Sequence, residues 1–324
     1  MMTEHELELR SWLSPDCVSD FDDMYYCRVL GAANNIRMIG KMYADLASSA
    51  GEKNLDGDAL LARMEEISRY FIDKRGESSY AIVAAIRLMT AGLSELKGSP
   101  MEEVRRALTS AYRAYTEQSE HWTAQLREHL WEIVAPMDRV LLFDYSSTVN
   151  LVMQVAVERG KELEVYVPES RILDGGHAYV RNGVALGHKV HYFPDAAIGH
   201  FAKEIDAAFI GAETFFPNGN AANTVGSDLT AIACRYYGKP LYVLTQLIKV
   251  DPRGSTEKTL YEDASAYFGL HLEEHLRETA DLSTAGLVTV PAGLITAFIT
   301  EEGILQPEEL EMACGAFVKR MEEM

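Results

Sequence analysis

The chain has 324 residues, of which 48% are apolar and 24% charged. This balance excludes a disordered or collagen-like protein and provides enough chain for one large core or two domains. The 49 acidic residues outnumber the 30 Lys and Arg residues, for a formal net charge of -19. Because such a surface repels phosphate backbones, we expect no nucleic-acid partner and no membrane surface, whereas a small phosphorylated ligand in a local positive pocket stays compatible.

The cysteines and the N-terminal residues favour a cytoplasmic protein. Cys17, Cys27, Cys234 and Cys314 are scattered, without a CxxC pair or zinc-type spacing, so reduced thiols are expected. The first residues lack the basic and apolar regions of a signal peptide. No apolar run approaches the ~18 residues of a membrane span.

The first half of the sequence predicts an N-terminal helical domain, residues 1–135. Apolar residues recur at three- and four-residue steps over residues 22–49, 58–74, 78–96 and 101 to about 135. The last of these helices would be on the order of 50 Å long, at 1.5 Å per residue. It would form the backbone of the helical domain and connect it to the next one.

From Pro136 onward the sequence alternates between short apolar runs and helical patterns. Strands are predicted at residues 139–143, 163–167, 189–193, 207–210 and 241–245. Helices are predicted between and after them, at residues 148–159, 176–186, 196–204, 227–237, 292–300 and 307–317. The fold class is therefore α/β, with the helical domain followed by a Rossmann-like, doubly wound parallel sheet in residues 136–324. Residues 249–284 break the rhythm and are interpreted as an insertion.

Ligands of open α/β sheets bind beyond the carboxyl ends of the strands, and the first predicted strand ends in a polar segment. Asp144-Tyr-Ser146-Ser147-Thr148 leads directly into a helix. Free backbone N–H groups and hydroxyls at a helix start suit an anion. A plain N-cap by Asp144 or a serine explains the same segment, and the segment alone favours that interpretation.

Two further strand ends are polar. At Glu169-Ser-Arg171 the guanidinium could hold a phosphate or pair with a neighbouring carboxylate, and the sequence supports both equally. The run GAETFFPNGNAANTVGS, from Gly211 to Ser227, contains the tight-turn pair Asn218-Gly219. It has more polar, flexible backbone than a turn needs, so a binding loop is predicted.

Other motifs are weaker. His271-Leu-Glu-Glu274-His275 matches an H-x-x-E-H metalloprotease pattern, but no third ligand is evident and a solvated helix explains it better. His188 and His191 stand at opposite parity about a short strand, so they cannot face one metal together. The glycine-rich nucleotide motifs are absent from the sequence. We therefore predict no metal and no cofactor.

Taken in order, four segments resemble one family. They are VYVPESRILDGG, HYFPDAAIGH, AAFIGAETFFPNGNAANTVGSDLTAIACRYYGKPLYVLTQ and VTVPAGLITAFITEEGILQPEEL, which together span most of residues 138–310. The family unites the α, β and δ regulatory subunits of translation initiation factor 2B with methylthioribose-1-phosphate isomerase and ribose-1,5-bisphosphate isomerase. The resemblance implies a helical domain, a Rossmann-like domain, and a homodimer or higher homo-oligomer built through the Rossmann-like domains. It also implies a phosphorylated sugar or related small molecule as ligand.

The resemblance places the family's functional positions on this sequence, with several changes. The catalytic Cys position falls on Asp144 and the catalytic Asp position on Glu213. Of the next Asn-Lys pair, Asn223 is kept and Thr224 replaces the Lys, while Gly175 stands at the position of a Gln. The implied ligand-binding residues are Ser146, Ser147, Arg171, Asn218, Gly219, Asn223 and, near an Arg-Pro-Thr motif, Arg75.

These changes leave two functions open. A thiol with a pKa of about 8.5 can donate a proton at neutral pH, whereas an Asp near 3.9 ordinarily cannot. If Asp144 and Glu213 shared a proton, one would act as acid and the other as base, which supports an aldose 1-phosphate to ketose phosphate isomerase with a rebuilt carboxylate site. The regulatory subunits also carry Glu in the GAE segment and lack the Cys. The alternative is therefore a non-catalytic, ligand-binding or regulatory homologue.

Overall fold

The structure, a computed structural model, describes residues 2–26, 28–29, 31–77, 79–265 and 272–323. The chain forms two compact units, one of Met1–His121 with Phe317–Met324 and the other of Trp122–Ala316. The division falls inside the long helix α6 (Met101–Val134). The sequence placed the domain boundary at residue 136, just before the first strand of the sheet, and that boundary stays a prediction.

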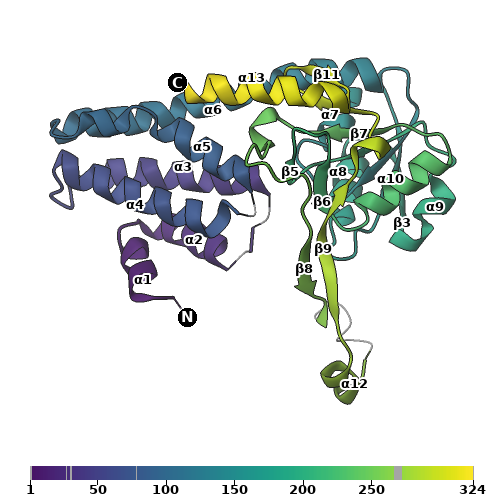
Figure 1. Cartoon of the computed structure of the whole chain (residues 1–324), viewed down its shortest axis with the longest axis horizontal. Coiled ribbons are helices and arrows are strands. Elements are labelled where there is room, and N and C mark those ends of the chain that lie inside the picture. Colours follow the sequence, from purple (N-terminus) through teal and green to yellow (C-terminus); the bar gives the residue numbers. More distant parts are fainter. Residues whose placement is uncertain (1, 27, 30, 78, 266–271, 324) are drawn as a thin grey trace. The chain divides into compact units, whose positions relative to one another are not determined.

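The first unit is helical, in agreement with the periodicity of the sequence (Figure 1). Its helices are α1 (Glu4–Ser11), α2 (Pro15–Tyr25), α3 (Ala32–Ser49), α4 (Gly57–Arg75), α5 (Tyr80–Thr90), the 3-10 turn η1 (Leu93–Leu96) and the first part of α6. The prediction of one helix over residues 22–49 was wrong, because α3 begins only after Gly31. That residue has φ +87°, a left-handed conformation that an α-helix cannot contain.

The second unit contains the parallel sheet predicted from the sequence. Its strands are β1 (Arg139–Phe143), β2 (Glu164–Pro168), β3 (Lys189–Phe193), β4 (Ala207–Ile210), β7 (Leu241–Leu244), β10 (Ala297–Thr300) and β11 (Gly303–Leu305). Their order is β11-β10-β7-β4-β1-β2-β3, and all neighbours are parallel except the β10–β11 pair at one edge. Successive strands run outward from β1 in both directions, so the sheet is doubly wound and the α/β prediction is confirmed.

The prediction of a helix over residues 292–300 was wrong. That segment contains only the short 3-10 turn η4 (Ala292–Leu294), and then enters the sheet as β10. All four residues of β10 are buried, which is the pattern of a central parallel strand rather than of an amphipathic helix. The chain then passes the turn η5 (Pro307–Glu309) and ends in α13 (Leu310–Glu322).

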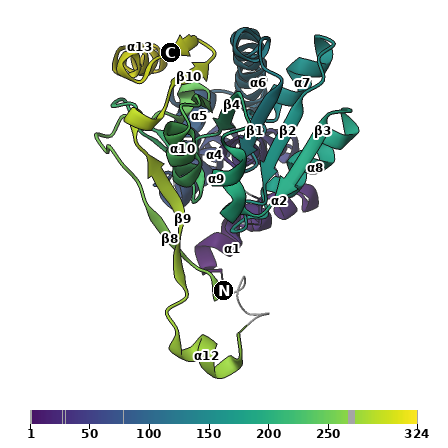
Figure 2. The ribbon, with the colours of Figure 1, turned by 90° about the vertical axis from the view of Figure 1, so that its right-hand side faces the viewer.

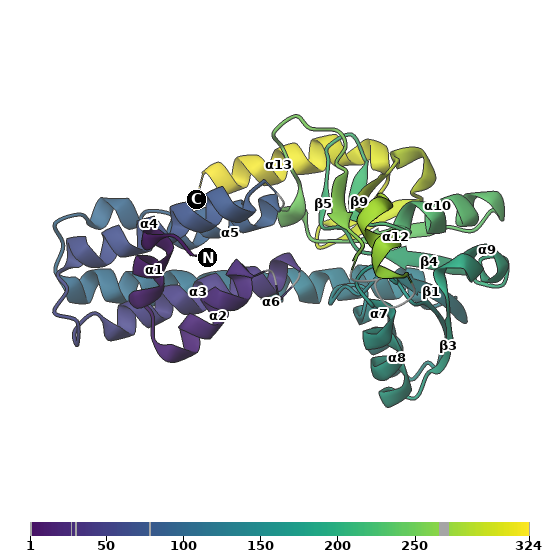
Figure 3. The same cartoon turned by 90° about the horizontal axis from the view of Figure 1, so that it is seen from below.

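Helices cover both faces of this sheet, as two turned views show (Figure 2, Figure 3). Strand residues such as Val140, Leu142 and Phe209 pack in one buried cluster with α7 (Leu151–Glu158), α8 (Gly176–Ala185) and the last turns of α6. Along the chain, the helix α9 (Ile198–Phe201) comes between β3 and β4, and the helix α10 (Ser227–Tyr236) comes before β7. Because side chains alternate along a strand, the two faces need separate helical layers.

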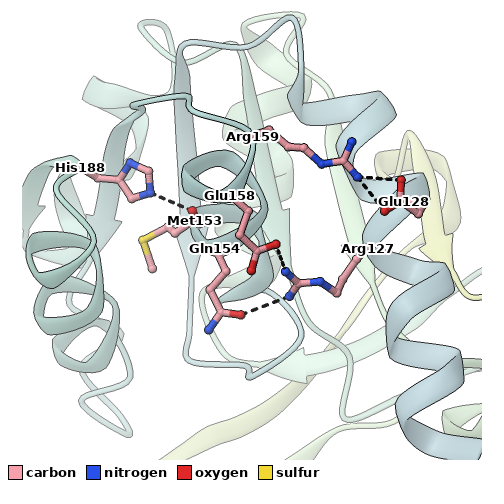
Figure 4. A network of polar contacts seen from close by, with 7 residues as sticks. All are labelled: Arg127, Glu128, Met153, Gln154, Glu158, Arg159 and His188. Carbon is pink, nitrogen blue, oxygen red and sulfur yellow. Dashed lines mark hydrogen bonds and ion pairs between the residues drawn. The ribbon is translucent and has the colours of Figure 1, made fainter.

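Polar contacts hold the last turns of α6 against α7 (Figure 4). Arg127 pairs with Glu158, and the Nη2 of Arg159 lies 2.7 Å from a carboxylate oxygen of Glu128. The buried His188 accepts a hydrogen bond at Nδ1 from the backbone N–H of Leu163, 3.1 Å away. Its Nε2 lies 2.9 Å from the Met153 carbonyl oxygen, so the ring bridges α7 and the residue before β2.

A second, four-stranded sheet has the order β5-β6-β9-β8. Its strands are β5 (Thr214–Phe215), β6 (Ala221–Thr224), β8 (Leu260–Asp263) and β9 (Ser283–Val290). Most of the segment predicted as a binding loop, residues 211–227, is therefore the β5–β6 hairpin, residues 214–224. The β8–β9 pair forms an arm that ends near α12 (Glu274–Thr279), visible in Figure 2.

Two predictions concern metal and membrane binding. His271, the first residue of the metalloprotease pattern, lies outside the described residues, and His275 is an exposed residue of α12. Among the residues that the structure describes, His, Cys, Asp and Glu form no group of three or more that could hold a metal ion. Over the same residues, no helix combines the length and the apolar character that spanning a membrane would require.

Gly226, just before α10, is a position where the fold tolerates only glycine. Its φ is +100°, and a Cβ would lie 2.4 Å from the ring of Phe143. We expect Gly226→Ala to lower the free energy of unfolding by about 2–5 kcal/mol, from backbone strain and overpacking together. Gly238→Ala is the matched control, because Gly238 has φ +64° with open space around it, and it should cost about 1 kcal/mol. Equal losses in urea unfolding of the two variants would contradict this packing.

Candidate functional site

The winding of the large sheet reverses between β1 and β4, and this reversal defines the candidate site. β2 and β3 extend the sheet on one side of β1, and β4, β7 and β10 extend it on the other. In open α/β sheets, ligands bind at such a switch point, beyond the carboxyl ends of the two strands. Asp144 directly follows β1 and Glu213 follows β4, so the two carboxylates singled out in the sequence belong to this edge.

The carboxyl group of Asp144 is buried and fully hydrogen-bonded. The side chain is 8% exposed. Its Oδ1 accepts from the Ser170 hydroxyl and its Oδ2 from the Thr224 hydroxyl, each at 2.8 Å. Asp144 does not cap α7, which begins at Leu151. The N-cap interpretation of Asp144 is therefore wrong, and the group is instead shared between the loops after β1 and β2 and the strand β6.

The surroundings of Asp144 favour its protonated form. Burial raises the pKa of this carboxyl group above the usual Asp range, and the charge of Glu213 raises it further. The hydroxyls of Thr224 and Ser170 act in the opposite direction because they stabilise the carboxylate. A carboxyl group with a raised pKa at a switch point is a candidate proton donor.

Glu213 is held by contacts on both sides of it. Its backbone N–H donates to the Ala222 carbonyl at 2.9 Å. Lys249, in the 3-10 turn η3 (Leu247–Lys249), donates from Nζ to the Ala212 carbonyl at 2.7 Å, and its own carbonyl accepts from the Thr214 hydroxyl at 2.9 Å. Burial lowers the pKa of Lys249, and the negative charge of Glu213 offsets this only in part. The Lys249 amine is thus held at the backbone beside Glu213.

The segment after Asp144 forms a turn before α7. The backbone N–H of Ser146 donates to the phenol oxygen of Tyr179 at 2.9 Å, and that phenol donates to the Asp144 carbonyl at 2.8 Å. Ser146 Oγ lies 3.5 Å from the Val149 N–H, and Ser147 is exposed. Tyr179 therefore fixes the backbone of this turn, while the hydroxyl of Ser147 faces solvent.

Arg171 makes the pairing that the sequence left open. Its Nη1 lies 3.5 Å from Glu169 Oε2, and its side chain is 63% exposed. The backbone N–H groups of Ser170 and Arg171 both donate to the Asp195 carboxylate, at 2.8 and 2.9 Å. The structure thus places the guanidinium at the surface beside one carboxylate, and anchors its backbone with another.

The remaining predicted ligand residues lie in three places. Asn218 and Gly219 form the turn of the β5–β6 hairpin, where the Asn218 side chain accepts from the Asn220 N–H at 3.1 Å. The buried Asn223 donates to the Ser227 hydroxyl at 2.9 Å, at the start of α10. Arg75 is the last residue of α4 and belongs to the first unit. A ligand role for each of them stays a prediction.

Sequence reasoning missed three residues that complete this site. Ser170 and Tyr179 bind Asp144, and Lys249 binds the backbone beside Glu213. Lys249 had a usable signal, because it follows β7, whose carboxyl end lies next to that of β4 in a parallel sheet. The Ser170 and Tyr179 contacts join residues 26 and 35 positions apart in the sequence, for which periodicity gives no register.

The fold is that of a doubly wound α/β protein, with polar side chains at the switch point of its sheet. A family model, the initiation factor 2 subunit family, matches residues 42–307 of the chain. The match covers well over half of the sequence, so the chain belongs to this family. The resemblance predicted from the strand-end segments is confirmed.

Relatives with assigned names are sugar-phosphate isomerases. A methylthioribose-1-phosphate isomerase of Syntrophotalea carbinolica is 27% identical over 248 residues, covering 72% of each chain. A ribose 1,5-bisphosphate isomerase of Haloferax volcanii is 23% identical over 269 residues, covering 79% of this chain and 78% of the relative. The chain is thus isomerase-like at the level of the family.

Solved structures share the fold. The 5-methylthioribose 1-phosphate isomerase of Pyrococcus horikoshii superimposes with a TM-score of 0.80 at 16% identity, covering 95% of this chain and 92% of that one. The eIF2B β subunit of Chaetomium thermophilum gives 0.62 at 16% identity, covering 98% and 96%. Enzymes and regulatory subunits of the family therefore share one architecture with this chain, and the fold alone does not separate them.

The raised pKa of Asp144 makes stability depend on pH in a defined direction. The folded protein holds this proton more tightly than the unfolded chain does, whose Asp titrates at about 3.9. The stabilisation is complete below that pH and is lost as pH rises through the higher folded pKa. Asp144→Asn lacks this dependence, so its free energy of unfolding should rise relative to that of the unsubstituted protein across the same window.

Urea unfolding at a series of pH values would test this. Asp16→Asn, at an exposed position in α2, is the control and should show no such trend. A difference between Asp144→Asn and the unsubstituted protein that stays constant with pH would contradict the buried, proton-retaining carboxyl group.

Proposed function

We propose that this protein is a sugar-phosphate isomerase that converts an aldose 1-phosphate to a ketose phosphate, with Asp144 as proton donor and Glu213 as proton acceptor. The observation that carries the proposal is the buried Asp144 carboxyl group with its raised pKa, at the switch point of the sheet. The names of the relatives support the class of reaction.

The chemistry requires one acid and one base. Over the whole reaction the ring oxygen gains a proton as its bond to C1 breaks, and the C2 hydroxyl loses a proton as C2 becomes a carbonyl. The hydrogen on C2 moves to C1. A thiol is the acid suggested by the family resemblance, and Asp144 replaces it. Burial and the nearby charge of Glu213 give this carboxyl group the proton-holding character that an ordinary Asp lacks.

We assign the role of base to Glu213, the other carboxyl group at the switch point. Its charge acts on both the Asp144 carboxyl group and the Lys249 amine. The two carboxyl groups therefore experience different surroundings, hydroxyls around Asp144 and a lysine near Glu213. Environments that separate two carboxyl groups in this way are typical of acid–base pairs.

The phosphate group of the substrate would bind at the turn before α7 and at Arg171. Ser146 and Ser147 offer hydroxyls there, and Asn223 offers an amide across the site. The exposed pair between Arg171 and Glu169 is worth only about 0.2–1 kcal/mol, so a phosphate dianion could displace Glu169 from the guanidinium. The proposal extends to a cytoplasmic homodimer or higher homo-oligomer.

One observation favours a second function, a non-catalytic binder of phosphorylated ligands. Both oxygens of Asp144 already accept hydrogen bonds from protein hydroxyls, so the carboxyl group could serve only to hold three segments together. In that case the protein would bind a sugar phosphate without converting it. A ligand at a hundredfold excess over its Kd should then stabilise the protein by about 2.7 kcal/mol, with no product formed.

Product analysis with ribose 1,5-bisphosphate, methylthioribose 1-phosphate and other aldose 1-phosphates would test the proposal. We expect a ketose product from at least one of them. Asp144→Asn and Glu213→Gln should each lower kcat by about 10²–10⁴-fold, because each removes one proton-transfer group. Glu162→Gln, at an exposed position ahead of β2, is the matched control and should leave kcat unchanged.

The outcomes separate the two functions. Thermal stabilisation by a sugar phosphate without any ketose would overturn the isomerase proposal in favour of the binder. Turnover that survives both Asp144→Asn and Glu213→Gln would show that the reaction does not use these carboxyl groups. Neither turnover nor stabilisation would remove both small-molecule functions.

A further inference from the structure

Three of the positions at which this sequence departs from the family resemblance meet at one carboxyl group. Asp144 stands at the Cys position, Thr224 at the Lys position and Gly175 at the Gln position. Thr224 Oγ1 donates to Asp144 Oδ2 at 2.8 Å, and a Cβ on Gly175 would lie 2.4 Å from Asp144 Oδ1. The three departures are therefore parts of one arrangement, although they lie far apart in the sequence.

Thr224, Ser170 and Gly175 each supply something that a buried carboxyl group requires, either a hydrogen-bond donor or space. A polar group removed from water is costly unless it is hydrogen-bonded, and Thr224 and Ser170 supply one donor for each oxygen. Gly175 leaves space for Oδ1 and the Ser170 hydroxyl, because any side chain there would displace them. Both hydroxyl-bearing residues are themselves buried, at 6% and 1% exposed.

The backbone of Asp144 and of the loop after β2 adopts strained, positive φ angles. Among the described residues with a side chain, four have positive φ, and three of them are Asp144 at 54°, Ser170 at 49° and Asp174 at 51°. Left-handed backbone costs about 1–2 kcal/mol for such residues, and it persists where the surrounding contacts demand it. Here it directs the Asp144 and Ser170 side chains toward each other.

We propose that Thr224 is a positioning residue that, together with Ser170, holds the Asp144 carboxyl group in its orientation and sets how readily that group releases its proton. This inference rests on the proposed function, in which Asp144 is the acid. A lysine at position 224 would instead place an ammonium beside the carboxyl group and keep it ionised. Thr224 stabilises the ionised form only by one neutral donor, so Asp144 can keep its proton.

The direction of the effect follows from the donor. A hydroxyl that donates to a carboxylate stabilises the ionised form, so removing it favours the protonated form. The other titratable groups that face Asp144 are Glu213, whose charge favours protonation, and Tyr179, whose phenol is kept neutral by burial that raises its pKa. Neither group is altered by a change at position 224.

The pH profile of kcat tests the positioning role. Activity should fall at high pH as Asp144 loses its proton, and in Thr224→Val this fall should move upward by about one pH unit. Ser170→Ala should move it in the same direction, and Thr224→Ser, which keeps the hydroxyl, should restore the original profile. Thr230→Val is the matched control, since the buried Thr230 hydroxyl binds the Gly226 carbonyl instead, and its profile should not move.

A purely structural role gives a different result. If Thr224→Val and Ser170→Ala lose activity or stability while kcat still falls at the original pH, the positioning role is overturned. If Thr224→Val does not fold, the pH profile of Ser170→Ala alone decides the test.

A second measurement separates this inference from the proposed function. Infrared difference spectra between the unsubstituted protein and Asp144→Asn, recorded across pH, report the protonation of this carboxyl group without any substrate. If the protein turns nothing over, but Thr224→Val still raises the pH at which Asp144 ionises, the isomerase function fails and the positioning of the carboxyl group stands. An unchanged ionisation in Thr224→Val overturns the inference whether or not the enzyme is active.

Discussion

The site depends on one constraint, the removal of a carboxyl group from water at the end of β1. A buried carboxyl group without partners is too costly to keep, and Asp144 meets this cost with two hydroxyls, one from the loop after β2 and one from β6. The absence of a side chain at Gly175 and the left-handed backbone of Asp144 and Ser170 follow from the same requirement. Three segments are thus fixed around one group.

This constraint also joins the two sheets of the second unit. Asp144 follows β1 of the large sheet, whereas Thr224 ends β6 of the small antiparallel sheet. Glu213 lies where the chain passes from β4 of the large sheet to β5 of the small one, and Lys249 holds the residues on either side of it. The candidate acid and base are therefore both placed at the boundary between the sheets, where the chain reverses its winding.

The sequence predicts the fold well where the pattern is local, and poorly where contacts are long-range. Residues 139–143 and 189–193 are strands in the structure with the predicted bounds, because buried parallel strands are short apolar runs between turns. β10 was predicted as a helix, since a run such as Ala-Phe-Ile-Thr gives no periodicity that separates the two. The contact between Asp144 and Thr224 spans 80 residues, and only the resemblance named both positions. The resemblance could not predict that the two side chains are in contact. The catalytic and binding roles of the site residues stay predictions.

The most direct test of the account is the position of one proton. A joint neutron and X-ray structure of the deuterium-exchanged protein, at a pH where it is active, would show whether Asp144 carries a deuteron. The account predicts a deuteron on one oxygen of the Asp144 carboxyl group. An Asp144 carboxylate that carries no deuteron at that pH would contradict its role as the acid.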